Sequence, residues 1–245
     1  MTDHQSPFAN SLFPFVADNL APHRNPVTCI LASLERTLAV CTRTERVEAD
    51  MVVIRPGVEH WVEINGRAKV LYFDGLAFPL AATLAAHVPR EVATLAIDAL
   101  TSTPGAQEEL RAKLTRAREQ CSPAVVRAIH AIGHDPMTRM AQSELAKRLR
   151  RERTQALRAF KTATGMTFRE FKRWTALCAA TRLIAEGQLV RTAAIDTGFA
   201  DTAHLTRTFR TAFGTTPTLA TAKRPAVDGQ RGSDQATDRD ASRSD

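Results

Sequence analysis

One predicted helix in the C-terminal half carries side chains that could hydrogen bond to the edges of DNA bases. The candidate base-contacting residues are Thr202, Ala203, His204, Thr206 and Arg207. A guanidinium can bond guanine O6 and N7 together, whereas hydroxyl, imidazole and methyl groups contact neighbouring base edges. These residue types within two helical turns indicate recognition in the major groove of DNA.

The same helix must bury its other side to hold those groups in place. Leu205, Phe209, Ala212 and Phe213 recur at helical spacing and form one core-facing stripe. Arg207 lies on the opposite side, so the helix has a buried apolar face and an open basic face. The alternative is an ordinary helical hairpin whose outer face is solvated, which is the default for a helix pair in isolation.

A shorter helix precedes this one, and the pair is predicted to form a helix–turn–helix unit. The apolar face of the first helix, over about residues 190–197, is supplied by Val190, Ala193, Ala194 and Ile195. Gly198 ends that helix, because glycine readily adopts φ > 0 at a helix C-terminus. Phe199 is expected to be buried, and Asp201 or Thr202 to cap the second helix.

Charge is distributed unevenly along the chain. Residues 120–224 hold 18 Lys and Arg against 7 Asp and Glu, a net charge of +11, whereas residues 1–119 have a net charge of −2. A basic block of this kind favours nucleic acid over membrane, since no Trp- and Leu-rich face opposes it. The N-terminus lacks the pattern of a signal peptide, and the four cysteines show no metal-ligand spacing. We therefore expect a cytoplasmic protein.

The stretch from Gly187 to Pro217 resembles the second helix–turn–helix of AraC-type transcriptional regulators. The matching positions are Ala193-Ala194, Gly198-Phe199, Asp201, Leu205, Arg207, Phe209 and Phe213-Gly214-Thr215-Thr216-Pro217. The resemblance implies a first unit upstream, a linker helix over about residues 169–186 and double-stranded promoter DNA as partner. It also implies a homodimer and a contact with RNA polymerase.

The first unit departs from the family pattern in its turn. Arg150-Arg151-Glu152 stands where the family has small, apolar and Ser residues, and Ala156 replaces a Leu. We therefore expect the first unit to be more loosely packed than the second. The residues that match base-contacting positions in this unit are Thr154, Gln155 and Arg158. In the turn, Arg150, Arg151 and Arg153 are expected to contact phosphates rather than bases. Further phosphate candidates, for which solvated surface charge is the alternative, are Lys161, Lys172, Arg173 and Arg210.

The first half of the chain is predicted to be a small β barrel or sandwich. Apolar and β-branched runs between Val27 and about Asp74 are separated by turn signals. Asn65-Gly66 predicts a two-residue hairpin between the strands on either side of it. The segment around Asn65-Gly66 resembles the cupin-type sensor domains of AraC-type regulators.

A cupin enzyme needs several inward metal ligands, and His60 stands alone on its predicted strand face. We therefore expect no metal, no cofactor, no catalytic residue and no enzymatic activity. A small-molecule effector is the expected partner of this domain. The candidate effector-binding residues are His60, Arg55, Trp61 and Tyr72.

These predictions add up to an α+β protein of two main domains. The predicted divisions are a cupin-like sensor over 1–76, a helical linker or dimerisation region over 77–119, a DNA-binding domain over 120–222 and a disordered tail over 223–245. Residues 1–26 form either an arm or an edge strand. The expected function is sequence-specific transcriptional regulation under the control of a small-molecule effector, without membrane contact. The alternatives are a non-specific architectural DNA binder and a cupin-type enzyme.

Overall fold

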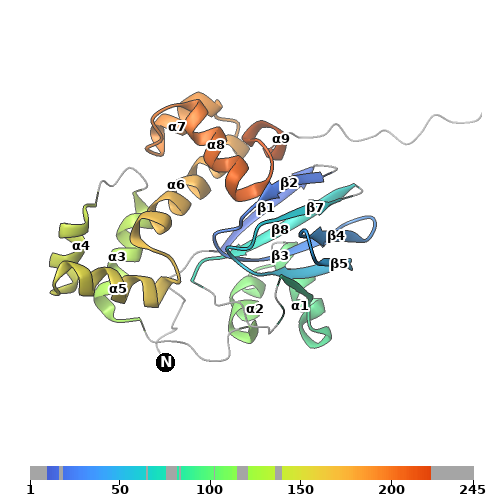
Figure 1. Cartoon of the computed structure of the whole chain (residues 1–245), viewed down its shortest axis with the longest axis horizontal. Coiled ribbons are helices and arrows are strands. Elements are labelled where there is room, and N and C mark those ends of the chain that lie inside the picture. The colour runs from blue at the N-terminus through green and yellow to red at the C-terminus, as the bar shows by residue number, and fades with distance from the viewer. Residues whose placement is uncertain are drawn as a thin grey trace, which may run out of the picture.

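A computed structural model describes residues 10–16, 19–64, 66–75, 82, 84–101, 103–114, 121–135 and 140–221. The strands come first along the chain and form one lobe, and the later helices form a second region beside it (Figure 1). This is the predicted α+β class. The predicted tail lies outside the described residues.

The β lobe consists of two antiparallel sheets. The five-stranded sheet has the order β1 (Asn10–Val16), β8 (Arg67–Phe73), β3 (Thr28–Ser33), β6 (Met51–Ile54) and β9 (Ala85–His87). The four-stranded sheet has the order β2 (Asn19–His23), β7 (His60–Glu63), β4 (Leu38–Cys41) and β5 (Arg46–Ala49). Side chains from both sheets share one buried core. The N-terminal stretch, for which the sequence allowed an arm or an edge strand, thus supplies an edge strand to each sheet, β1 to one and β2 to the other.

Strand β3 shows why the first half folds this way. Its run of apolar residues is buried on both faces, as expected for a strand covered from two sides. Cys29 and Leu31 face the core between the sheets, whereas Ile30 and Ala32 face a second core. The helices α1 (Ala93–Leu100) and α2 (Ala106–Leu114) supply the other side of that second core.

The predicted hairpin at Asn65-Gly66 is wrong. Strands β7 and β8 flank this dipeptide, but they belong to different sheets and do not pair with each other. Asn65 lies outside the described residues. Gly66 has φ +117°, and a Cβ at this position would collide with the Glu35 carboxylate. The glycine is therefore used to carry the chain from one sheet to the other rather than to close a hairpin.

The start of the region predicted to be helical, 77–119, is not a helix in its described part. Ala85–His87 forms strand β9, which pairs with β6 at the edge of the five-stranded sheet. Short apolar runs fit a strand and a buried helix equally well by periodicity, and pairing with β6 decides the outcome here. Helices α1 and α2, which follow within the predicted helical region, are present.

Seven helices follow from residue 123 within the described part of the chain. They are α3 (Pro123–His134), α4 (Gln142–Leu149), α5 (Arg153–Thr164), α6 (Phe168–Ala185), α7 (Val190–Asp196), α8 (Thr202–Phe213) and α9 (Pro217–Thr221). Their ends follow the sequence: Ser122 caps α3 ahead of Pro123, and Thr167 with Glu170 forms a capping box on α6. Figure 1 shows α6 running between the α4–α5 pair and the α7–α8 pair.

Candidate nucleic-acid interface

The turn between α7 and α8 positions the predicted base-contacting helix. Gly198 has φ +85°, and Phe199 beyond it is 6% exposed. The Asp201 carboxylate accepts a hydrogen bond of 2.6 Å from the backbone N–H of His204 and so caps α8. This turn forms as the sequence predicts.

Helix α8 has the two faces expected of a recognition helix. Its buried stripe consists of Leu205, Phe209, Ala212 and Phe213. The exposed residues include Ala203, His204, Arg207, Arg210 and Thr211, and Thr202 and Thr206 are partly exposed. The His204 ring also packs edge-on against Phe199, with 5.2 Å between ring centroids. All the predicted base-contacting side chains therefore lie outside the buried stripe of one helix.

One residue assigned to the apolar frame of this unit is misplaced. Ile195 is 52% exposed, whereas Ala193 and Ala194 are fully buried. Helix α7 has only seven residues; its buried residues are the two alanines, and Val190 packs against the same core. Ile195 therefore does not support α8 as the spacing suggested.

The first helix–turn–helix consists of α4, a three-residue turn and α5. Arg150 adopts the left-handed conformation with φ 51°, and the backbone N–H of Arg151 donates to the Ala146 carbonyl at 3.1 Å. Glu152 caps α5, since its carboxylate accepts from the N–H groups of Thr154 and Gln155. The turn is hydrogen bonded throughout although its sequence departs from the family pattern.

The core of the first unit is closed to solvent. Ala156 is fully buried, as are Leu145 and Phe160 around it. Because an Ala buries less surface than a Leu, and because Arg150, Arg151 and Glu152 in the turn are exposed, a looser first unit stays a prediction. The candidate base-contacting residues Thr154, Gln155 and Arg158 are exposed on α5.

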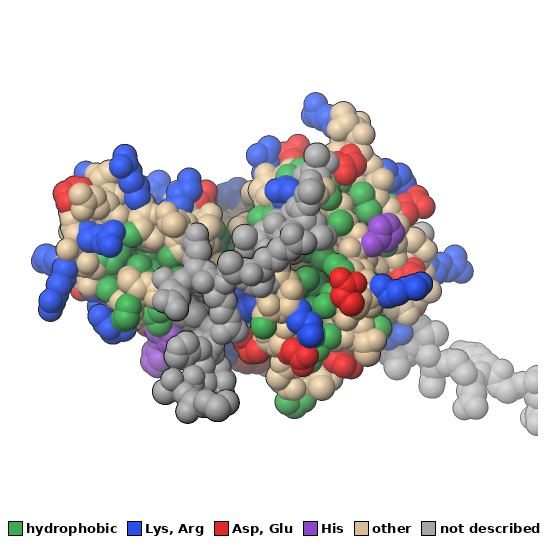
Figure 2. All heavy atoms as spheres, turned by 90° about the horizontal axis from the view of Figure 1, so that it is seen from below, with side chains coloured by type: hydrophobic (Ala, Val, Ile, Leu, Met, Phe, Trp, Pro, Cys, Tyr) green, Lys and Arg blue, Asp and Glu red, His purple; other side chains and the backbone are tan. Residues whose placement is uncertain are grey.

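Most of the phosphate candidates are open to solvent, but Lys172 is not fully so. Arg151, Arg153, Lys161, Arg173 and Arg210 are exposed. The Lys172 ammonium donates to the Met140 carbonyl at 2.9 Å and lies over the Phe168 ring, and partial burial lowers the pKa of this amine. Lys172 therefore joins α6 to the segment before α4. Figure 2 shows Lys and Arg side chains spread over the lobe that contains α4 and α5.

Strand β2 is joined to the end of α8 through main-chain atoms. The backbone N–H of Ala21 donates to the Gly214 carbonyl and that of Arg24 to the Thr211 carbonyl, each at 2.9 Å. The last carbonyls of a helix lack partners inside the helix, and here the β lobe supplies them. The recognition helix of the second unit is therefore attached directly to the β lobe, beside which it lies in Figure 1.

A buried group of side chains extends this junction, and the sequence analysis missed its central residue, Asp74. The Trp174 indole N–H donates to the Asp74 carboxylate, and Arg111 donates to the Asp74 carbonyl at 2.6 Å. Burial raises the pKa of Asp74 to about 7, and the indole and guanidinium groups oppose that rise. Tyr72 packs beside it against Trp174 and Phe213, with ring centroids 5.4 and 5.3 Å apart.

His60 does not stand alone, because the fold brings His23 and Asn25 to it. The two imidazole centroids are 4.3 Å apart, and Asn25 Nδ2 lies 3.4 Å from His60 Nε2. Burial is the largest cause of the lowered pKa of both imidazoles, and it takes the pKa of His23 to about 3. No group of three His, Cys, Asp or Glu side chains among the described residues is arranged to hold a metal ion.

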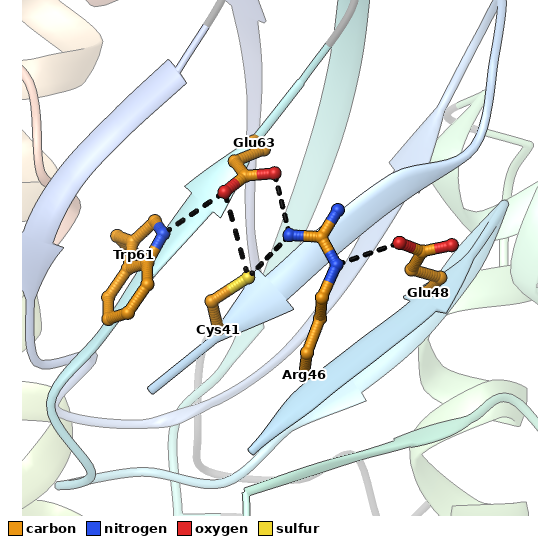
Figure 3. A network of polar contacts seen from close by, with 5 residues as sticks. All are labelled: Cys41, Arg46, Glu48, Trp61 and Glu63. Carbon is orange, nitrogen blue, oxygen red and sulfur yellow. Dashed lines mark hydrogen bonds and ion pairs between the residues drawn. The ribbon is translucent and has the colours of Figure 1, made fainter. Parts of the chain in front are cut away.

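Among the four predicted effector-binding residues, Trp61 and His60 point to opposite faces of their strand. His60 is buried, and Tyr72 is buried in the core that the two sheets share, where it packs against Trp174 and Phe213. Arg55 donates to the Ala82 carbonyl. Trp61 lies on the other face of its strand from His60, where its indole N–H donates to Glu63 at 3.3 Å (Figure 3).

Figure 3 also shows what holds that face of the four-stranded sheet. Arg46 bridges two carboxylates, Glu48 and Glu63, with 2.7 Å to each, and it donates to the Cys41 sulfur at 3.3 Å. Hydrogen bonds from Arg46 and then Trp61 lower the pKa of Glu63. These groups satisfy one another, so this network explains the position of Trp61 without a ligand.

Comparison with known proteins agrees with this architecture. Residues 145–222 match the family described as a helix-turn-helix domain. A search of curated protein sequences finds no match to the chain. Among the described residues, no helix is long and apolar enough to cross a membrane.

Most of the chain resembles solved structures of ToxT from Vibrio cholerae. One at 1.65 Å resolution shares 10% identity over 86% of this chain and 96% of ToxT, with a TM-score of 0.53. A fatty-acid-bound form from strain SCE256 shares 11% identity over 89% of this chain and 96% of ToxT, with a TM-score of 0.50.

The class of the protein follows from the two units and the family match: it is a helix-turn-helix DNA-binding transcriptional regulator. Its organisation, a β lobe followed by two helix–turn–helix units, fits the AraC type that the sequence resembles.

Proposed function

We propose that the protein binds promoter DNA in a sequence-specific manner and that a small molecule bound to its β lobe controls this binding. The observation that carries the proposal is the pair of helix–turn–helix units. Each presents exposed Arg, Thr and amide or imidazole groups on its second helix. The net charge of +11 over residues 120–224 supplies the non-specific part of the affinity.

Control by a small molecule is supported by the attachment of α8 to the β lobe. A ligand that changes the β lobe would act on the recognition helix through β2 and through Tyr72. One of the similar ToxT structures is bound to an unsaturated fatty acid, and this supports an apolar small molecule as the kind of effector to test first. We expect His60 and its neighbours to respond to the effector rather than to perform chemistry.

The location, the oligomeric state, the protein partner and the domain divisions belong to the same proposal. The protein would act in the cytoplasm as a homodimer, with α1 and α2 available for pairing, and would contact RNA polymerase. Its divisions would be the sensor over 1–76, the linker over 77–119, the DNA-binding domain over 120–222 and the tail over 223–245. Strand β9 shows that the linker also contributes to the five-stranded sheet.

The proposal is tested by measuring affinity for the protein's own promoter against scrambled DNA of equal length and composition. A regulator prefers the promoter by at least about 10³-fold. Equal affinity for the two duplexes would instead identify an architectural DNA binder.

A cupin-type enzyme is the other alternative, and metal analysis separates it from a regulator. We expect no stoichiometric metal in the purified protein. Metal that is bound in a one-to-one ratio and lost in His60→Ala would contradict an effector-only β lobe.

A further inference from the structure

The backbone of Arg24 lies against the C-terminal end of the recognition helix α8, although Arg24 belongs to the β lobe. Its backbone N–H donates to the Thr211 carbonyl in the last turn of α8 at 2.9 Å. Its side chain is 60% exposed. A cation from the β lobe is thus held beside the helix that is predicted to contact bases.

The place of Arg24 relative to α8 is fixed by a close main-chain contact. Ala21, three residues earlier, donates its N–H to the Gly214 carbonyl at 2.9 Å. A Cβ at Gly214 would collide with the Ala21 carbonyl and with the His23 ring, so the strand approaches the helix as closely as glycine permits. The substitution of the Arg24 side chain leaves these main-chain bonds intact.

Arg24 adds a cation of the β lobe next to the last turn of α8, whose exposed residues include further cations. Arg207, Arg210 and Thr211 are exposed on the helix, and the Thr211 hydroxyl donates to the Arg207 carbonyl at 2.9 Å. Arg207 lies one turn before Thr211, and Arg210 lies in the last turn, to which the backbone of Arg24 is bound. A duplex seated on this face would bring a phosphate strand past the end of the helix, where a guanidinium binds phosphate well.

Glu59 forms an ion pair with the guanidinium of Arg24 in the free protein. Its carboxylate lies 3.2 Å from Nη2 of Arg24, and both side chains are more than half exposed. An exposed ion pair of this kind gains little net energy, so the guanidinium can exchange the carboxylate for a phosphate. The same carboxylate would repel a phosphate that approaches Arg24.

We propose that Arg24 is a contact to the DNA backbone supplied by the β lobe, and that Glu59 holds Arg24 in the free protein and weakens DNA binding. This inference rests on the proposed function, because it assumes that α8 binds DNA. It assigns the β lobe a direct part in DNA affinity, in addition to its role in sensing.

The test measures the affinity of full-length variants for promoter and scrambled duplexes over a range of salt concentrations. Arg24→Gln should lower affinity for both duplexes equally and reduce the slope of log K against log salt by about one unit. Arg24→Lys should restore the slope, because it keeps the charge. Glu59→Gln should raise affinity for both duplexes.

A matched control is the Arg67–Glu35 pair, which has the same charges at 2.9 Å and similar exposure. Arg67 begins β8, whereas the contact with α6 is made at the far end of that strand. Arg67→Gln should leave the slope unchanged. An unchanged slope in Arg24→Gln, or an equal loss in Arg67→Gln, would overturn the inference. Loss of promoter preference in the wild type would overturn the proposed function alone, because the slope is also measured on scrambled DNA.

Discussion

Base discrimination is expected to depend most on Arg207, which is exposed on a helix with a fully buried opposite face. A rigidly held helix lets a bidentate guanidinium distinguish guanine from other bases. Arg207→Ala should therefore cost about 1–3 kcal/mol on the specific site and relax preference at one base pair. Competition binding against a set of single-base site variants measures both effects.

Arg151→Ala is the matched variant from the first unit. Its exposed side chain lies in the turn before α5, so a phosphate contact is expected there. Binding to specific and random DNA should weaken equally, with a slope about one unit flatter. The assignment of roles would be falsified by Arg207→Ala leaving specificity intact while Arg151→Ala abolishes it.

Asp74 makes folding stability depend on pH with a defined sign. Its pKa in the folded protein is raised to about 7 from an ordinary 3.8, so its protonated form favours the folded state. This contribution is complete below about pH 4 and is lost as pH rises to about 7. Buried His23 and His60 act in the opposite sense, because their lowered pKa values favour unfolding as pH falls below about 6.5.

Asp74→Asn isolates the carboxyl contribution, since an amide oxygen can still accept from Trp174. The stability of Asp74→Asn relative to wild type should rise between pH 4 and pH 7, by at most about 1.4 kcal/mol per pH unit. Urea unfolding at a series of pH values measures this difference. A pH-independent difference for Asp74→Asn would contradict a raised pKa.

At the residue scale the sequence predicted side chains whose role is local and missed those whose role depends on distant partners. Arg207 and its neighbours follow from helical spacing within α8. His60 contacts His23, which lies 37 positions earlier in the sequence, and Trp174 bonds Asp74, which lies 100 positions earlier. The periodicity of apolar residues carries no information about contacts at that separation. Only the pairing of strands and the docking of helices brings these groups together.

Among the elements, the turn of the first helix–turn–helix stores backbone strain. Arg150 is a non-glycine residue at φ 51°, which costs roughly 1 kcal/mol or more relative to glycine. Arg150→Gly should therefore raise the free energy of unfolding by about 0.5–1 kcal/mol. Chemical denaturation measures the change, and Arg151→Gly, whose φ is not positive, should give no gain.

The errors at the element scale came from signals that are sound locally. Asn-Gly favours a hairpin, but β7 and β8 had to enter different sheets to close the β lobe, and Gly66 serves the crossing instead. The segment containing Ala85–His87 fits a helix by composition, yet the edge of β6 was open to a partner strand. Both outcomes depended on which strand edges remained unpaired. A short segment of sequence carries no information about that.

For the molecule as a whole, the charge distribution predicts strongly salt-dependent DNA binding. The net charge of +11 over residues 120–224 should release several counterions, giving a slope on the order of −4 to −8 in log K against log salt. Titrations of the full-length protein at several salt concentrations measure it. A nearly flat dependence would count against DNA as the partner.

The joint between β2 and α8 has a consequence for how the protein can change over evolutionary time. Both hydrogen bonds are made by main-chain atoms, so side chains along β2 can be exchanged without removing them. The chief demand on residue identity falls on Gly214, where there is no room for a Cβ. Descendants of this protein could therefore diverge widely in sequence and still inherit the same mechanical link between the two lobes.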